Sequence, residues 1–258
     1  MNDISVIIPT WNRANSIEKA VCSALHQTVP PLEVLVCDDG STDNTEALIR
    51  GIKDSRVQWV PGIHSGLPAV PRNRGIQASK GDWLAFLDSD DAWLAEKLEK
   101  QLELAKVLGC KAVSSNALRF LPGKGIQGNL LDWDKERICF ADLMQENQII
   151  CSSTLVHKSL FQTVIGFPAE PGVIEDYALW LRVATQTDFA YVAEPLLIYQ
   201  DDPANSVRSI VTSYVWMQRK EIFKNFLAWA SEQGLEVSFS SEAGAQYRKA
   251  LRKIEKHR

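Results

Sequence analysis

Short apolar runs alternate with helical patterns through the first hundred residues of the chain. The runs are too short for helices and are typical of strands buried on both faces. The predicted strands are 4–8, 32–37, 57–60 and 83–87. The predicted helices are 16–26, 45–53, 72–79 and 96–108. This alternation predicts an α/β fold built from βαβ units around a mainly parallel sheet.

The pattern changes in the second half of the chain. From about residue 112 the alternation weakens, and residues 122–128 are rich in glycine and turn-forming residues. We predict that 111–210 form an irregular half packed on the regular half 1–110, within one domain. Residues 211–258 are predicted to be a C-terminal helical extension.

Polar clusters follow three of the predicted strands at the point where each strand ends. They comprise residues 10–12, 38–43 and 88–91. Ligands of parallel α/β sheets bind beyond the carboxyl ends of the strands, so we expect the three clusters to form one site.

The third cluster is a group of carboxylates, Asp88, Asp90 and Asp91. Carboxylate oxygens suit Mg²⁺ or Mn²⁺, which usually take one or two of them together with phosphate oxygens and water. A turn in which Asp91 caps the following helix explains the pattern equally well.

The second cluster contains Asp39, directly after the second predicted strand. A carboxylate there can accept a hydrogen bond from the imide N–H of uracil or thymine, which cytosine lacks. The alternative is a polar loop that caps the helix beginning at Thr45.

Composition and charge narrow the class of protein. The chain has 258 residues, 45% of them hydrophobic, and a net charge of -4, so no global positive field favours nucleic acid. Its five cysteines are odd in number and widely spaced, which argues against a disulfide framework or a zinc site.

The two ends of the chain bear on its location. No basic-then-apolar leader and no apolar stretch of about 20 residues is present, so we expect a cytoplasmic protein without a membrane span. The basic, amphipathic tail from Tyr247 is more typical of a solvated final helix, and it also fits peripheral contact with an anionic membrane.

Four segments together resemble glycosyltransferase family 2, the inverting family with the GT-A fold. They read SVIIPTWNR, VCDDGSTDNT, RNRGIQASKGDWLAFLDSDD and IEDYALWLR. Their order and spacing carry the resemblance, which extends from about residue 3 to about residue 207. It implies a Rossmann-like sheet flanked by helices, with 1–110 as the nucleotide-sugar-binding half and 111–210 as the acceptor-binding and catalytic-base half.

The resemblance implies a role for residues after the first two strands. Pro9, Thr10 and Asn12 match the segment that lines the nucleotide pocket. Asp39 matches the aspartate that reads the uracil edge.

Further roles are implied around the aspartate cluster. Asp88 is expected to face the ribose and metal region, and Asp90 is expected to bind a divalent cation, Mn²⁺ or Mg²⁺, directly. Arg72 and Asn73 match an Arg-Asn-x-Gly segment that steadies the donor diphosphate. For Asn73, helix initiation is an equal alternative.

The fourth segment supplies the implied catalytic base. Asp176 matches the residue that removes the acceptor hydroxyl's proton, while Glu175 and Trp180 are assigned to the acceptor side. Without the resemblance, Glu175 and Asp176 are better explained as acidic residues that begin a helix. Residues 200–206 lack the basic residue that the family often has, and the motif of processive members is missing.

These matches predict transfer of a sugar from a nucleoside-diphosphate donor, UDP first and dTDP next. The expected acceptor is a hydroxyl of a saccharide or lipid-linked acceptor in cell-surface polysaccharide or glycan biosynthesis. A nucleotidyltransferase is disfavoured because residues 9–14 are not a glycine-rich basic loop. A non-catalytic nucleotide-sugar-binding protein is the other alternative.

Overall fold

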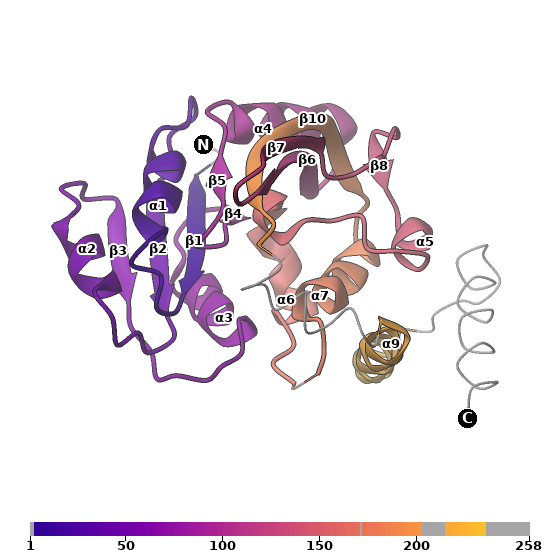
Figure 1. Ribbon diagram of the computed structural model, residues 1–258. Helices are drawn as coiled ribbons and strands as arrows, with labels where there is room; N and C mark the ends of the chain where they lie inside the picture. The colour runs from indigo at the N-terminus through magenta and orange to yellow at the C-terminus, as the bar shows by residue number, and fades with distance from the viewer. Residues whose placement is uncertain (1–2, 171, 203–214, 236–258) are drawn as a thin grey trace.

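A ten-stranded mixed sheet runs through the computed structural model, which describes residues 3–170, 172–202 and 215–235 (Figure 1). Its main path is β3-β2-β1-β4-β9-β6-β10-β5, with β7 paired to β6 and β8 paired to β10. The strands are β1 (Ile4–Thr10), β2 (Glu33–Asp38), β3 (Val57–Val60), β4 (Trp83–Phe86), β5 (Ala92–Trp93), β6 (Ala112–Leu121), β7 (Gly125–Asn129), β8 (Arg137–Ile138), β9 (Leu155–His157) and β10 (Phe189–Gln200).

Helices flank this sheet, as predicted. They are α1 (Ile17–Leu25), α2 (Thr45–Gly51), α3 (Ala69–Ala78), α4 (Lys97–Leu108), α5 (Phe140–Leu143), α6 (Phe161–Val164), α7 (Glu175–Ala184) and α9 (Val215–Glu232), with 3₁₀ turns η1 (Cys151–Ser153) and η2 (Lys158–Leu160). The α/β fold class is therefore confirmed.

The two halves of the sheet differ in strand direction. In the first half β3, β2, β1 and β4 are all parallel, as the βαβ alternation predicts. Beyond β4 the sheet is mixed, because β9 runs antiparallel to both β4 and β6. β6 and β10 restore a parallel pair. The prediction of a mainly parallel sheet therefore holds for residues 1–110, while short antiparallel strands join the second half to it.

Alternating side chains of the central strands pack into two separate hydrophobic cores. Ile7 of β1 packs in the core that contains α3, α7 and α9 residues, whereas Val6 and Ile8 pack in the core that contains α1 and α4 residues. Because side chains of a strand alternate between faces, each of these strands carries apolar residues on both faces. The short continuous apolar runs of the sequence have this origin.

The second half is more regular than its sequence suggests. β6 and β10 are the longest strands that the structure describes, with 10 and 12 residues. Polar residues in β6 hide its strand pattern, since Ser115 and Asn116 are buried and hydrogen-bonded. The glycine-rich stretch forms the β6–β7 turn, where Gly123 has φ 75°, and the first residues of β7.

Part of the C-terminal extension belongs to the folded core. Ile222, Phe226 and Trp229 of α9 are buried in the same core as α7, and α3, α7 and α9 lie along the lower side of the view in Figure 1. The basic tail from Tyr247 lies outside the described residues. Within the described part of the chain, no helix combines the length and apolar character needed to cross a membrane.

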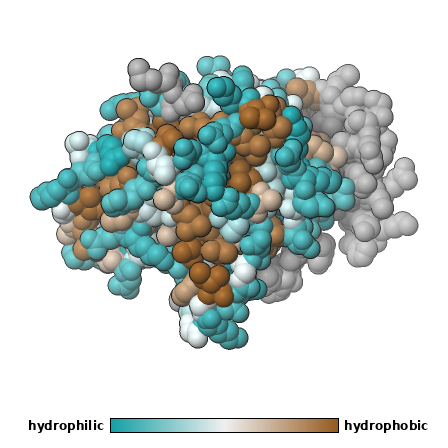
Figure 2. All heavy atoms as spheres, turned by 90° about the horizontal axis from the view of Figure 1, so that it is seen from above, coloured by the Kyte–Doolittle hydropathy of each residue, from teal (hydrophilic) through white to brown (hydrophobic). Residues whose placement is uncertain are grey.

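Apolar residues also reach the surface. Seen from above, they form a strip through the middle of the face, with hydrophilic residues on either side (Figure 2). The large exposed apolar side chains are Trp11, Leu32, Ile63, Val107, Ile126, Ile165 and Leu235. They come from different elements, and single exposures of this kind are ordinary on a protein surface.

Candidate active site

The loops after β1 and β2 are joined through Asn12. Its backbone N–H donates to the Ser41 hydroxyl at 2.9 Å, and its side-chain oxygen accepts from the Thr42 N–H at 2.8 Å. Asn12 has φ 52°, in the left-handed region that asparagine tolerates better than most residues. The predicted residue thus holds two of the three strand-end loops together.

Pro9 and Thr10 are the last residues of β1, which is longer than the predicted 4–8. Pro9 lies opposite Cys37 of β2, and Thr10 lies opposite Asp38. Thr10 is buried, and its hydroxyl has no hydrogen-bond partner among the described residues. A buried hydroxyl of this kind normally has a partner, so its position at the strand end suits contact with a polar ligand.

Asp39 is buried and holds the 64–66 loop. Its carboxylate accepts from the Ser65 hydroxyl at 2.7 Å, the Ser65 N–H at 3.0 Å and the Gly66 N–H at 2.9 Å. The His64 ring lies 3.1 Å from the same carboxylate and stacks on Trp11, with ring centroids 4.4 Å apart.

Trp11 and His64 add an aromatic surface to the site, which was not predicted from the sequence. Trp11 is 48% exposed beside the carboxylate predicted to read a base. A flat, exposed ring next to a carboxylate can stack on a base whose N–H is read at its edge. The sequence could have indicated this role, because Trp11 lies between Thr10 and Asn12, which are both assigned to the nucleotide pocket.

Arg72 joins the first half of the chain to the second. Its guanidinium lies 2.7 Å from Asp88 Oδ1, just after β4, and 2.6 Å from Glu175 Oε1 at the start of α7. Only 6% of the Arg72 side chain is exposed. The predicted contact of Arg72 with a diphosphate is therefore not what this geometry favours, because both ends of the guanidinium already face carboxylates.

Asn73 is a structural clamp in this geometry. Its amide donates to the Phe167 carbonyl at 2.8 Å and accepts from the Phe167 N–H at 2.8 Å. Its side chain is therefore directed at the segment before α7, and its role at the donor diphosphate stays a prediction. Helix initiation is wrong, because α3 begins at Ala69 and Asn73 lies in its second turn.

Asp90 is more exposed than Asp88 and Asp91 in the aspartate cluster. Its side chain is 42% exposed and lies 3.5 Å from the Arg13 guanidinium. Burial first, and then the charge of Asp88, raise the pKa of Asp90, while Arg13 opposes the shift. A second carboxylate close enough to raise the pKa of Asp90 makes this edge of the sheet attractive to a cation.

Asp91 does not have the helix-capping role considered as an alternative. It is buried, and its carboxylate accepts from the Gln200 N–H at 2.9 Å. The following helix begins only at Lys97. Burial and the charges of Asp88 and Asp90 raise the pKa of Asp91 well above its usual range.

The carboxylates fit a cation that is shared with a ligand. Among the described residues, no three His, Cys, Asp or Glu side chains are grouped as a metal cage. Mg²⁺ and Mn²⁺ commonly bind through one or two carboxylates and take their other ligands from phosphates and water. Asp90, with Asp88 beside it, matches that donor set, so an ion here would depend on a bound diphosphate.

Asp176 lies in the first turn of α7, beside the ion pair of Glu175 with Arg72. Burial and then the charge of Glu175 raise the pKa of Asp176 to about 7, while Arg72 opposes the shift. A carboxylate with this pKa is partly ionised at neutral pH and is suited to accept a proton.

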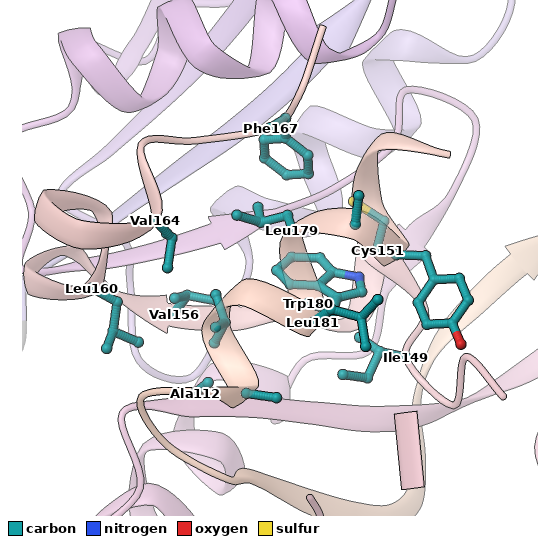
Figure 3. Close-up of a cluster of buried hydrophobic side chains, with 14 of the residues drawn as sticks. Ala112, Ile149, Cys151, Val156, Leu160, Val164, Phe167, Leu179, Trp180 and Leu181 are labelled. Carbon is teal, nitrogen blue, oxygen red and sulfur yellow. The ribbon is translucent and has the colours of Figure 1, made fainter. Parts of the chain in front are cut away.

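Trp180 belongs to the core, which corrects its assignment to the acceptor side. Its side chain is fully buried and packs edge-to-face against Phe167 and Phe189, at centroid distances of 5.8 and 5.7 Å. Figure 3 shows its ring surrounded by apolar side chains. A side chain without exposed surface does not contact an acceptor.

The loop that departs from the family pattern is described only at its start. Asp201 is paired with Arg119, 2.6 Å away, and residues 203–206 lie outside the described part of the chain.

A sheet flanked by helices, with polar and acidic side chains at the ends of β1, β2 and β4, is the arrangement that the resemblance to glycosyltransferases implies. Residues 5–161 match Glycosyl transferase family 2, and the chain belongs to this family. It is thus a glycosyltransferase.

Particular relatives support the same family. The chain is 31% identical over 186 residues, 72% of each chain, to UDP-Glc:alpha-D-GlcNAc-diphosphoundecaprenol beta-1,3-glucosyltransferase WfaP of Escherichia coli. It is 29% identical over 189 residues to WfgD of the same organism, which has the same activity in its name, covering 73% of this chain and 72% of WfgD.

Among solved structures, S. aureus TarS 1–349 in complex with UDP is similar in fold. The TM-score is 0.71 at 18% identity, covering 95% of this chain and 68% of that chain. At this identity the likeness shows the fold alone.

Proposed function

We propose that the protein is an inverting, metal-dependent glycosyltransferase that moves a hexose from a UDP-sugar, with dTDP next, to a hydroxyl of a saccharide or lipid-linked acceptor. The observation that carries the proposal is the Arg72 bridge. This side chain forms ion pairs both with Glu175, in the first turn of α7, and with Asp88, directly after β4. A donor bound beyond β1, β2 and β4 would then lie next to Asp176.

Donor recognition follows from the first two strand ends. Asp39 would accept the imide N–H of uracil or thymine in place of one of its loop contacts, with Trp11 beneath the base. A cytosine donor would leave that carboxylate without its proton donor, which favours uridine or thymidine donors.

The chemistry follows from the position of Asp176. The acceptor oxygen attacks the anomeric carbon while its proton passes to the Asp176 carboxylate. The bond from the anomeric carbon to the diphosphate oxygen breaks, and the diphosphate leaves with the electron pair. Attack on the face opposite the leaving group inverts the anomeric configuration.

Asp90, with Asp88 nearby, would hold a divalent cation together with the donor diphosphate. When bound, such a cation neutralises the charge that develops on the departing diphosphate. Arg13 lies within reach of Asp90, so its positive charge is also available at this edge of the sheet.

The acceptor class is proposed from the relatives. The E. coli enzymes WfaP and WfgD are named for transfer to a diphosphoundecaprenol-linked sugar, and a Bacillus subtilis relative, 31% identical over 192 residues, is named as a putative teichuronic acid biosynthesis glycosyltransferase. We therefore propose a role in cell-surface polysaccharide or glycan biosynthesis, with peripheral contact at the inner face of a membrane.

The test is a donor and acceptor screen with purified protein. UDP- and dTDP-sugars are offered with Mn²⁺, Mg²⁺ or a chelator, together with a diphospholipid-linked GlcNAc analogue. We expect release of nucleoside diphosphate, loss of transfer with chelator, and a product of inverted anomeric configuration by NMR. Release of pyrophosphate, or a retained configuration, would contradict the proposal.

A matched pair of variants tests the metal site. Asp90→Ala should abolish metal-assisted UDP binding, whereas Glu18→Ala, an exposed carboxylate of α1, should leave it unchanged. Isothermal titration of UDP with and without Mn²⁺ measures both. Equal enhancement by the metal in both variants would exclude Asp90 as its ligand.

A further inference from the structure

The ion pairs of Arg72 connect three elements that are far apart in the sequence. The guanidinium comes from α3, Asp88 follows β4, and Glu175 begins α7. Asp88 is 31% exposed and Glu175 is 20% exposed, while Arg72 is nearly buried between them. The two carboxylates are thus partly exposed, and the Arg72 guanidinium that joins them is buried.

Arg72 is held in this position from other sides as well. Its guanidinium carbon lies 5.3 Å above the centroid of the Phe167 ring, and Asn73 clamps the backbone of Phe167. The planar, two-ended guanidinium can bond two carboxylates at once, which a lysine ammonium on a flexible stem does less well.

We propose that Arg72 is a positioning residue for the catalytic base: by holding Asp88 and Glu175 together, it fixes the first turn of α7 and so sets Asp176 against the donor strand end. This inference rests on the proposed function of Asp176. It replaces a direct role of Arg72 at the diphosphate with a role exerted through Glu175.

The charges that surround Asp176 give the proposal a distinctive consequence. Glu175, its neighbour on α7, raises the pKa of Asp176, and Arg72 of α3 lowers it. Asp88 adds a smaller increase, the Tyr177 N–H lowers the pKa, and the Cys151 thiol of η1 is also close enough to interact. Glu175 and Arg72, which form one ion pair, therefore shift the pKa of Asp176 in opposite directions.

The experiment compares the pH dependence of kcat in the wild type, Arg72→Gln and Glu175→Gln. Because the base must be ionised, kcat should rise with pH and level off above the pKa of Asp176. We expect this acid limb to move to higher pH in Arg72→Gln and to lower pH in Glu175→Gln. If the pKa of the base shifts by about one unit, kcat at any pH below that pKa changes about tenfold.

A lysine at position 72 separates the effect of the positive charge from the effect of the two-ended contact. Arg72→Lys keeps the positive charge but not the two-ended contact, so we expect the limb near its wild-type pH and kcat reduced about tenfold or more. The donor KM should change less than kcat in these variants, because both ends of the Arg72 guanidinium are engaged by carboxylates. Circular dichroism and UDP affinity establish that each variant is folded.

The outcomes distinguish the inference from the function on which it rests. If the wild type transfers no sugar, the proposed function fails. If the wild type transfers sugar but the limbs of the variants stay in place or move in the same direction, only the role of Arg72 is refuted. If Arg72→Gln does not fold, the shift in Glu175→Gln and the kcat of Arg72→Lys still decide.

Discussion

Replacing Asn73 distinguishes the role implied by the sequence resemblance from the role found in the structure. In the structure, both polar atoms of its side chain bond the backbone of Phe167, a residue that is 3% exposed. Asn73→Ala would leave that N–H and that carbonyl without partners. Each buried group left unpaired costs about 1–3 kcal/mol. Asn73 itself is only partly buried, which favours the low end of that range, so we expect a loss of about 2–4 kcal/mol.

The assays are chemical and thermal denaturation, together with a binding measurement. For a domain of this size, the expected loss corresponds to a decrease in Tm of roughly 4–16 °C. The affinity for UDP, measured by calorimetry well below the Tm, should change little. Gln77→Ala, an exposed position one turn further along α3, is the matched control and should be neutral within about 0.5 kcal/mol.

The opposite pattern would refute this reasoning. If Asn73→Ala lowered UDP affinity tenfold while the free energy of unfolding stayed at the wild-type value, Asn73 would be a donor ligand. The side chain would then have to leave Phe167 when the nucleotide binds.

Three further outcomes are expected. Trp180→Phe should lower the free energy of unfolding by about 1–3 kcal/mol in urea denaturation without changing the acceptor KM, because the ring lies in the core. Gly75→Ala should destabilise by about 1–3 kcal/mol, despite alanine's higher helix propensity, since its Cβ would lie 2.5 Å from an Ile7 methyl group and 2.8 Å from the Cys37 sulfur. Because folding raises the pKa of Asp176 to about 7, the folded wild type holds this proton more tightly and loses stability as pH rises from about 4 to about 7. Asp176→Asn should therefore gain stability relative to the wild type across that window, and a constant difference in Tm would contradict the assigned pKa.

Much of the first half could be predicted from the sequence, for a physical reason. Strands buried on both faces give short apolar runs, and their carboxyl ends are marked by polar residues. The predicted strand 57–60 coincides with β3, and the predicted helix 96–108 differs from α4 by one residue. The three polar clusters lie at the ends of β1, β2 and β4, which are neighbours in the sheet.

Other features depended on contacts between distant residues, which a local pattern does not contain. The buried serines and asparagine of β6 have no apolar periodicity, so the β6–β10 pair was missed. A tryptophan one turn after Asp176 has the same spacing whether it faces an acceptor or the core, and only the tertiary structure places Trp180. Likewise, the partners of Arg72 lie 16 and 103 residues away along the chain.

The central claim is that Asp176 accepts the proton of the acceptor hydroxyl in a site built on the strand ends. Its most direct test is Asp176→Asn, which removes the proton acceptor while keeping the shape of the side chain. We predict UDP affinity within about twofold of the wild type and a decrease in sugar transfer of about 10²–10⁴-fold, the usual contribution of a general base. Transfer at close to the wild-type rate, with UDP affinity unchanged, would contradict the account.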